Sequence, residues 1–240
     1  MQKKIRFNTI SLGSEPVQPD ISTLIRFIRS FRGRQSDLIT FKMIQSISAQ
    51  QKAGIITPGT GGMFYQPRLE AAITCHDEVC FHESSDILSD IHLIIQSAGP
   101  VQSVLPAPHL LLQSPKIDDE EQYADYCDEY FSIIRDMRDH GITGHIIHAK
   151  EGYEIELERL SSKKTWFVIP EGDKQKQENL LEHQTRIALH NSDLPMLPDL
   201  MDHYEIRHLT IIDPDETGFR FALEYLDPPY ITAGWHTLRQ

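Results

Sequence analysis

Side chains that transfer protons or bind metal ions stand at the ends of short apolar segments in this sequence. Four of these segments, "EVCFH", "GHIIH", "RIALH" and "AGWH", end in a histidine. The imidazole ring titrates near neutral pH and is a frequent metal ligand. Two further segments end beside a carboxylate, at Glu171 and at Asp213, and Lys150 follows the second histidine segment by two residues. This combination indicates general acid–base catalysis or chemistry at one divalent metal ion.

We predict a role for each of these residues from its chemistry and its place at a segment end. The expected catalytic residues are His148, Lys150, Glu171, His190 and Asp213. The expected metal ligands are His82, His148, His190 and His236. The expected substrate contacts are Gln113, Asn191, Gly61, Gly62 and Arg68. His145 lies three positions before His148, and side chains three positions apart on a strand point to opposite faces. His145 is therefore expected to be a structural residue.

Five apolar segments in the second half recur at a nearly constant interval, and they are the elements that must position these side chains. They begin near Thr143, Thr165, Arg186, His208 and Tyr230, at steps of 22, 21, 22 and 22 residues. Between them, apolar residues recur with helical spacing, as at Leu194, Leu197, Leu200 and Met201. An interval of this length holds one strand, one helix and two tight loops. Unbroken apolar strands that alternate with helices predict a parallel sheet buried on both faces.

Three further strands are expected in the first half, at the start of the chain, at Glu78–His82 and at Ala107–Gln113. Together with the five later segments they make eight, the number that closes a (β/α)8 barrel of the TIM type. The given sequence ends just after the last strand, without the usual eighth outer helix, so an open, doubly wound parallel sheet is the alternative. In either fold, ligands bind at the carboxyl ends of the strands, where the predicted residues are expected to meet.

We expect a single α/β domain over residues 1–240, with residues 37–65 as an N-terminal β insertion. This insertion holds "LITFKMI" and "GIITPGTGGMFY", which predict a β-hairpin or two more strands of a larger open sheet. The glycines of "TPGTGG" favour a flexible turn or lid, with a phosphate cradle as the alternative. Neither a P-loop ending nor a GxGxxG fingerprint is present, so no nucleotide cofactor is expected, and one divalent metal ion is the cofactor to test for.

Two cysteines and two histidines, Cys75, His76, Cys80 and His82, lie within eight positions. Cys80 and His82 fall on an expected strand and the other pair lies beyond its far end, so the four cannot surround one zinc ion. The cysteines are expected to be small buried side chains. With Cys127 they make an odd number, which fits free thiols in a reducing compartment and predicts a cytoplasmic protein.

The net charge of −12 disfavours nucleic acid or an anionic membrane as a partner, because both attract basic surfaces. No apolar run approaches the ~18–20 residues of a membrane span. The basic cluster "RFIRSFRGR" fits the solvated edge of a helix, with an anion-contact surface as the alternative. A homo-oligomer formed through the aromatic helix around Tyr123–Met137 is compatible with this sequence, although a core-facing role is favoured for that helix.

Two hypotheses for the function follow. The first is a barrel-type enzyme, a lyase, isomerase or hydrolase, that acts on a small polar or anionic metabolite by acid–base or single-metal chemistry. The second is a non-catalytic α/β protein that binds a ligand or takes part in an assembly, whose polar strand ends are only caps. The fold class alone does not decide between them, because one fold supports many functions.

Overall fold

The computed structural model describes residues 5–13, 16, 18–30, 37–76, 79–111, 115 and 117–235. Parallel strands in this part of the chain form two four-stranded sheets, in the orders β1-β10-β9-β8 and β2-β5-β6-β7. These strands are β1 (Asn8–Ser11), β2 (Gly59–Gly61), β5 (Gln102–Pro106), β6 (His145–His148), β7 (Thr165–Val168), β8 (Arg186–His190), β9 (His208–Ile212) and β10 (Ile231–Trp235). The fold is therefore α/β and TIM-barrel-like, with eight parallel strands that follow one another in chain order.

The two sheets meet at two seams, where side chains or single bridges replace a regular ladder. Between β1 and β2, the Ser11 amide donates to the Thr57 carbonyl at 3.2 Å and the Thr57 amide donates to the Thr9 carbonyl at 2.9 Å. Between β7 and β8, the Gln184 side chain accepts from the Phe167 amide at 2.8 Å and donates to the Phe167 carbonyl at 3.0 Å. A side-chain amide thus satisfies backbone groups that a neighbouring strand would otherwise pair.

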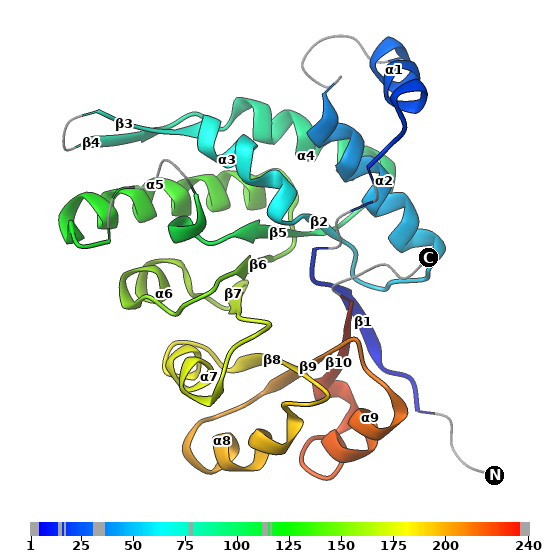
Figure 1. Cartoon of the computed structure of the whole chain (residues 1–240), viewed down its shortest axis with the longest axis vertical. Coiled ribbons are helices and arrows are strands. Elements are labelled where there is room, and N and C mark those ends of the chain that lie inside the picture. Colours follow the sequence, from blue (N-terminus) through cyan, green and yellow to red (C-terminus); the bar gives the residue numbers. More distant parts are fainter. Residues whose placement is uncertain are drawn as a thin grey trace.

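Helices follow most of the strands and lie outside them, with α2, α3 and α4 at the top, α5, α6 and α7 at the left and α8 and α9 at the bottom of Figure 1. They are α1 (Ile21–Ser30), α2 (Leu38–Lys52), α3 (Gln66–Ala72), α4 (Ser85–Ala98), α5 (Glu120–Asp139), α6 (Glu154–Leu160), α7 (Lys174–Leu181), α8 (Leu197–His203) and α9 (Glu216–Ala222). Short 3-10 turns lie at η2 (Met63–Tyr65), η3 (Pro108–Leu110), η4 (Leu194–Met196) and η5 (Pro228–Tyr230). None of these helices is long and apolar enough to cross a membrane, among the residues that the structure describes.

Buried apolar side chains divide into an inner set and outer sets. The inner set comes only from strands and the residue after β1: Ile10, Leu12, Val104, Ile146, Trp166, Val168, Ala188 and Ile212. Alternate residues of the same strands, such as Leu105, Ile147 and Phe167, pack in a separate cluster with the helices. This alternation identifies the inner set as the barrel interior. It also fixes the direction of polar neighbours, because a residue two positions from an inner residue points the same way.

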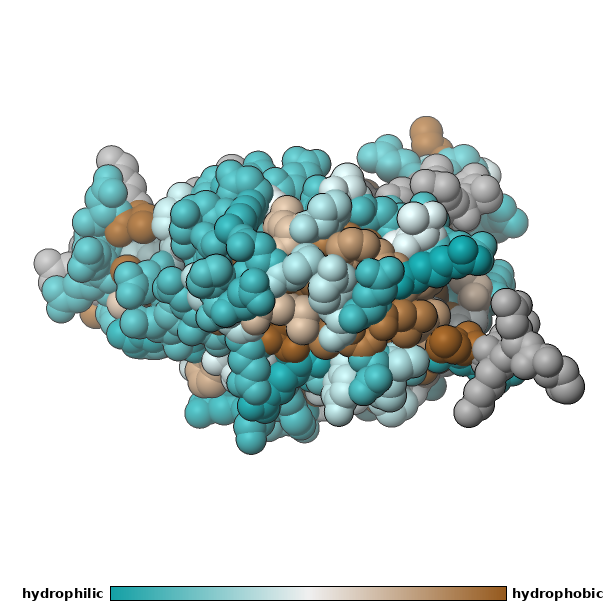
Figure 2. Space-filling model, turned by 90° about the horizontal axis from the view of Figure 1, so that it is seen from below, coloured by the Kyte–Doolittle hydropathy of each residue, from teal (hydrophilic) through white to brown (hydrophobic). Residues whose placement is uncertain are grey.

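A groove of about 600 Å³ runs along the outer face of β1 and β10 beside α9. Its apolar lining includes Phe7 just before β1, Phe219 of α9 and Trp235 of β10. Phe7 and Phe219 stack with their ring centroids 4.1 Å apart. Figure 2, seen from the side of α8 and α9, shows a band of apolar surface across that face.

The second half matches the expectation from the sequence. The five apolar segments are β6 to β10, and helices α6, α7, α8 and α9 separate them. Asp215 caps α9, since its carboxylate accepts from the Gly218 amide at 2.8 Å. The aromatic residues of α5 face the core: Tyr123, Tyr126 and Tyr130 are all buried, so this face is not a free surface.

The expected β-hairpin over residues 37–65 is wrong. The run "LITFKMI" begins helix α2, capped by Asp37, whose carboxylate accepts from the Thr40 amide at 2.9 Å. The run "TPGTGG" holds barrel strand β2 instead of a lid or cradle. This strand carries no apolar side chain, and the Gln50 side chain of α2 fixes it with 2.8 Å hydrogen bonds to the amide and carbonyl of Gly59.

Two other strand assignments in the first half need correction. The described part of the segment "EVCFH" is β4 (Val79–His82), which pairs antiparallel with β3 (Ile73–His76) outside the eight parallel strands. The β insertion therefore lies at Ile73–His82. The fifth strand of the chain is Gln102–Pro106, ahead of the expected Ala107–Gln113, which begins with the 3-10 turn η3.

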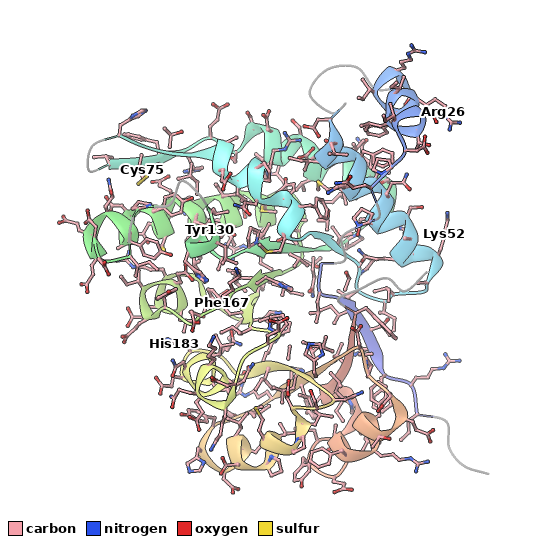
Figure 3. All side chains as sticks on the ribbon, in the orientation of Figure 1. Arg26, Lys52, Cys75, Tyr130, Phe167 and His183 are labelled. Atoms are coloured by element: carbon pink, nitrogen blue, oxygen red, sulfur yellow. A yellow bond between two sulfur atoms is a disulfide. The ribbon has the colours of Figure 1, made fainter. Side chains whose placement is uncertain are left out.

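Cys75 and Cys80 form a disulfide across this β3–β4 hairpin, visible as a yellow bond in Figure 3. The expectation of three free thiols is therefore wrong for these two residues. They face each other in the strand register, which places the sulfur atoms within bonding reach. Cys127 is a free, buried cysteine of α5, and burial raises the pKa of its thiol.

Candidate active site at the carboxyl ends of β6 and β7

A hollow of about 500 Å³ opens where β6 and β7 end. His148, Lys150 and Glu171, three of the predicted catalytic residues, line it together. Met63, Leu110 and Ile169 supply apolar wall, and Glu151 and Lys176 stand at the same opening. A hollow of this size suits a small metabolite, with convergent polar groups on an apolar wall.

His148 is the most enclosed polar side chain of the hollow, with 7% of its surface exposed. It ends β6 and pairs in register with Pro106 of β5 and Val168 of β7. Because Ile146 belongs to the barrel interior, His148, two residues later, also points inward. The Ala149 amide donates to the Val168 carbonyl at 3.0 Å, so the backbone at this exit is fixed.

His145 points to the opposite side of β6, as predicted. Its Nδ1 shares a 2.6 Å hydrogen bond with the Ser103 hydroxyl of β5. Burial lowers the pKa of His145 to about 3, and the positive charges of Arg138 and Lys164 act in the same direction. The ring is therefore neutral near pH 7 and holds a structural position between the sheet and its helices.

A buried carboxylate fixes the loop that carries Lys150, and sequence reasoning missed it. Glu156 of α6 is fully buried and accepts hydrogen bonds from the His109 amide at 2.7 Å and from the Tyr123 hydroxyl. His109 Nδ1 lies 2.9 Å from the same carboxylate. Its Nε2 accepts from the Lys150 amide at 3.3 Å. The chain Glu156–His109–Lys150 thus connects α6, η3 and the end of β6, residues too far apart in sequence for any spacing motif to reveal.

Positively and negatively charged side chains both line the edge of the hollow. Lys176 Nζ donates to the Lys150 carbonyl at 3.2 Å and pairs with Glu151 at 2.7 Å. Lys150 and Glu171 are exposed. Of these four side chains, the Lys150 ammonium and the Glu171 carboxylate have no ion-pair partner in the described part of the chain. They are therefore available to a ligand.

His190, Asn191 and Asp213 lie at the same end of the barrel but do not line this hollow. His190 points inward by its spacing from Ala188, and it pairs in register with Ile212, the residue before Asp213. Asp213 has a φ of 46°, an unusual conformation for a non-glycine residue, and its amide donates to the Gly234 carbonyl at 2.8 Å. Asn191 packs against α9, where a Cβ on Gly218 would lie 2.0 Å from its Oδ1. Asn191 therefore contacts α9 with a buried side-chain oxygen, and its role as a substrate contact stays a prediction.

The predicted anion contacts near β2 serve the fold. Gly61 has a φ of +92°, and a Cβ there would lie 2.4 Å from the Val104 carbonyl oxygen. Gly62 has a φ of +123° and packs on the Gly13 backbone. Arg68 forms ion pairs with Asp37 at 2.7 Å and with Asp90 at 2.8 Å, which join α3 to α2 and α4. The charge of Arg68 is thus neutralised inside the protein.

The predicted metal ligands do not assemble in the described chain. His82 lies on the β3–β4 hairpin, where its ring contacts Glu129 and lies 3.5 Å from Asp136, both on α5. No three His, Cys, Asp or Glu side chains are grouped to hold a metal ion, within the residues described. His236 and Gln113, the remaining predicted ligand and substrate contact, lie outside the described residues.

Comparison with known proteins supports the TIM-barrel class. No family model matches the chain, and no curated protein sequence matches it. A solved structure of a B12-independent methionine synthase from Shewanella sp. W3-18-1, in complex with selenomethionine, is similar with a TM-score of 0.67. That match has 13% sequence identity and covers 96% of this chain and 90% of the other.

A mandelate racemase/muconate lactonizing enzyme-like protein from Rubrobacter xylanophilus is similar with a TM-score of 0.50 and 8% identity. The match covers 97% of this chain and 54% of the other. The TM-scores show a shared fold, and identities this low carry no assignment of substrate or reaction.

Proposed function

We propose that this protein is a barrel-type enzyme that acts on a small polar or anionic metabolite by acid–base chemistry at the carboxyl ends of β6 and β7. The observation that supports it is the shared hollow of His148, Lys150 and Glu171. Active sites of TIM-barrel enzymes lie at this end of the barrel. The reaction classes that need only such groups are those of lyases, isomerases and hydrolases.

Each residue has a role that follows from its environment. His148 is enclosed and inward-pointing, so it is the proton donor or acceptor at the base of the hollow. Glu171 stands on the neighbouring strand exit and supplies the second proton-transfer group. Lys150 attracts an anionic substrate, and its backbone is fixed through His109. His190 and Asp213, on the next two strand exits, extend this site toward a larger substrate.

A non-catalytic binding role is the second proposal, since the same hollow can bind a metabolite without converting it. The experiment that separates the two uses a metabolite library of compounds below ~500 Da. Compounds that raise the melting temperature of the protein are then followed by NMR for conversion. The enzyme proposal expects conversion that is lost in His148→Gln and Glu171→Gln, with a fold unchanged by circular dichroism.

His92→Gln is the matched control, because His92 is exposed on α4 and remote from β6 and β7 in sequence and sheet order. Conversion that survives both His148→Gln and Glu171→Gln contradicts the proposed site. Binding at the hollow without conversion of any bound compound favours the non-catalytic role.

A small-molecule partner and a cytoplasmic location belong to the same proposal. The Cys75–Cys80 disulfide is at odds with a strongly reducing compartment, where such bonds are rare. Alkylation of thiols in freshly lysed cells tests the location. Cytoplasmic protein is expected to show two modifiable cysteines in the β3–β4 hairpin, and an intact disulfide in the fresh lysate argues for an oxidising compartment.

A further inference from the structure

A second hollow, of about 620 Å³, lies at the amino ends of β7, β8 and β9, opposite the proposed active site. Its ionisable lining residues are all basic: Lys163, His183, Arg186, Arg207 and His208. No carboxylate lines it in the described chain. This composition contrasts with a protein whose net charge is −12. Figure 3 labels His183 beside α7, at the junction with β8.

Arg186 begins β8 and points toward the barrel interior, because Ala188, two residues later, belongs to the inner set. His208 begins β9, pairs in register with Arg186 and points the same way, four residues before inner Ile212. Trp166, another inner residue, forms part of the wall. The amino end of the barrel thus holds the Arg186 guanidinium and the His208 imidazole on neighbouring strands.

Arg186 has no counter-charge within the described residues. It forms no ion pair there, and its guanidinium donates no hydrogen bond, although the side chain is half-buried. Burial lowers the pKa of this guanidinium, and no carboxylate acts in the other direction. Burial also lowers the pKa of His208, with Arg186 and Arg207 contributing in the same direction. A half-buried cation without a partner costs free energy that a bound anion recovers.

The other cations of the hollow are also available to a ligand. Lys163 is exposed and makes no ion pair among the described residues. Arg207 is exposed and pairs only with Glu205, two positions away, at 2.9 Å. An exposed pair of this kind contributes little and opens readily. The hollow therefore carries two positive charges without an ion-pair partner among the described residues, those of Lys163 and Arg186.

We propose that this basic hollow at the amino ends of β7, β8 and β9 is a binding site for a phosphate dianion, free or carried by a small metabolite. Donors line the hollow at three neighbouring strand starts, at Lys163 before β7, Arg186 on β8 and Arg207–His208 at β9. Several cationic donors around one hollow favour a doubly charged anion such as phosphate over a singly charged carboxylate. The guanidinium fork of Arg186 matches two phosphate oxygens. The site is independent of the proposed reaction at the other end of the barrel.

The test is calorimetric titration of the full chain at low ionic strength with inorganic phosphate, pyrophosphate and glycerol 3-phosphate. Arg186→Gln removes a charge-assisted donor and is expected to weaken phosphate binding at least tenfold. Lys163→Gln and Arg207→Gln change exposed residues and are each expected to weaken it several-fold, without affecting the fold. They keep the test decisive if Arg186→Gln fails to fold.

Arg220→Gln is the matched control, because it removes one exposed positive charge of α9, outside the hollow. Equal binding of inorganic phosphate and glycerol 3-phosphate identifies free phosphate as the ligand, whereas tighter binding of the ester identifies a phosphorylated metabolite. Both results support the site. Undetectable phosphate binding by the wild-type protein, or an equal loss in Arg220→Gln and in the hollow variants, overturns it.

Discussion

The two ends of the barrel differ in how their ionisable groups are arranged. The carboxyl-end hollow holds an imidazole, ammonium groups and carboxylates together, with its loop fixed by the buried Glu156. The ionisable side chains of the amino-end hollow are all basic, and its central cation, Arg186, has no counter-charge within the described residues. Strand β8 contributes to both ends, with Arg186 at its start and His190 at its finish.

This difference separates two tasks. Proton transfer needs groups that can both give and take a proton near the same substrate, so a mixed set is useful. Binding an anion needs donors and positive charge without competing carboxylates, so a uniform set is useful. The same strands can serve both tasks, because side chains at their two ends are separated by the packed interior.

The largest expected effect lies at the carboxyl end. Glu156→Ala leaves the His109 amide, the His109 ring and the Tyr123 hydroxyl without their acceptor. Loss of this buried carboxylate is expected to lower the free energy of unfolding by about 3–5 kcal/mol, measured by urea denaturation. Glu158→Ala, an exposed change on the same helix, is expected to cost less than about 0.5 kcal/mol. Equal losses in the two variants would show that the carboxyl-end loop is not fixed in this way.

A pH-dependent effect tests the difference between the two faces of β6. His145 has a folded pKa of about 3, below its ordinary value of about 6.5. Between these values the unfolded chain binds a proton that the folded chain excludes. The free energy of unfolding is therefore unaffected by protonation of His145 above about pH 6.5. It falls as pH drops from 6.5 toward 3, by roughly 3 kcal/mol at pH 4. His145→Gln is expected to flatten this part of the pH profile of urea midpoints, and an unchanged slope would contradict the buried neutral ring.

The smallest expected effect is a gain at the amino end. Arg186→Met removes an unpaired, half-buried charge and keeps the apolar part of the side chain. In phosphate-free buffer it is expected to raise the free energy of unfolding by about 0.5–1 kcal/mol. Arg159→Met is the comparison, because Arg159 is exposed and pairs with Asp128, so its loss is expected to be neutral or slightly destabilising. A clear destabilisation in Arg186→Met would show that Arg186 has a structural partner.

The fold of the second half was predictable because its strands are apolar and evenly spaced. Strands β6 to β10 each carry branched or aromatic side chains at the expected interval. The first half lacks this signal. Strand β2 consists of Gly59, Thr60 and Gly61, and a short apolar run such as "LITFKMI" fits a helix as well as a strand. Three barrel strands were expected in this half and three are present, but β2 was not predicted, Glu78–His82 lies outside the barrel, and β5 precedes the expected Ala107–Gln113.

Part of the candidate site was also predictable. Inspection of strand ends identified His148, Lys150 and Glu171, which share one hollow. The role of Glu156 was hidden, because nothing local in the sequence shows that a carboxylate in α6 accepts from His109. The basic hollow was not predicted, because it lies at the amino ends of the strands, whereas α/β folds bind ligands at the carboxyl ends. The available signal was that basic residues precede or begin three successive strands, at Lys163, Arg186 and Arg207.

The measurement that tests the separation of the two ends most directly is NMR of the histidine rings in protein labelled with 15N at its imidazole nitrogens. Resonances are assigned with His148→Gln and His208→Gln, and the protein is titrated with phosphate and with stabilising metabolites from the library. We predict that phosphate moves the His208 resonances and leaves His148 unchanged, whereas at least one stabilising metabolite moves His148. A His148 ring that no stabilising ligand perturbs would contradict the account.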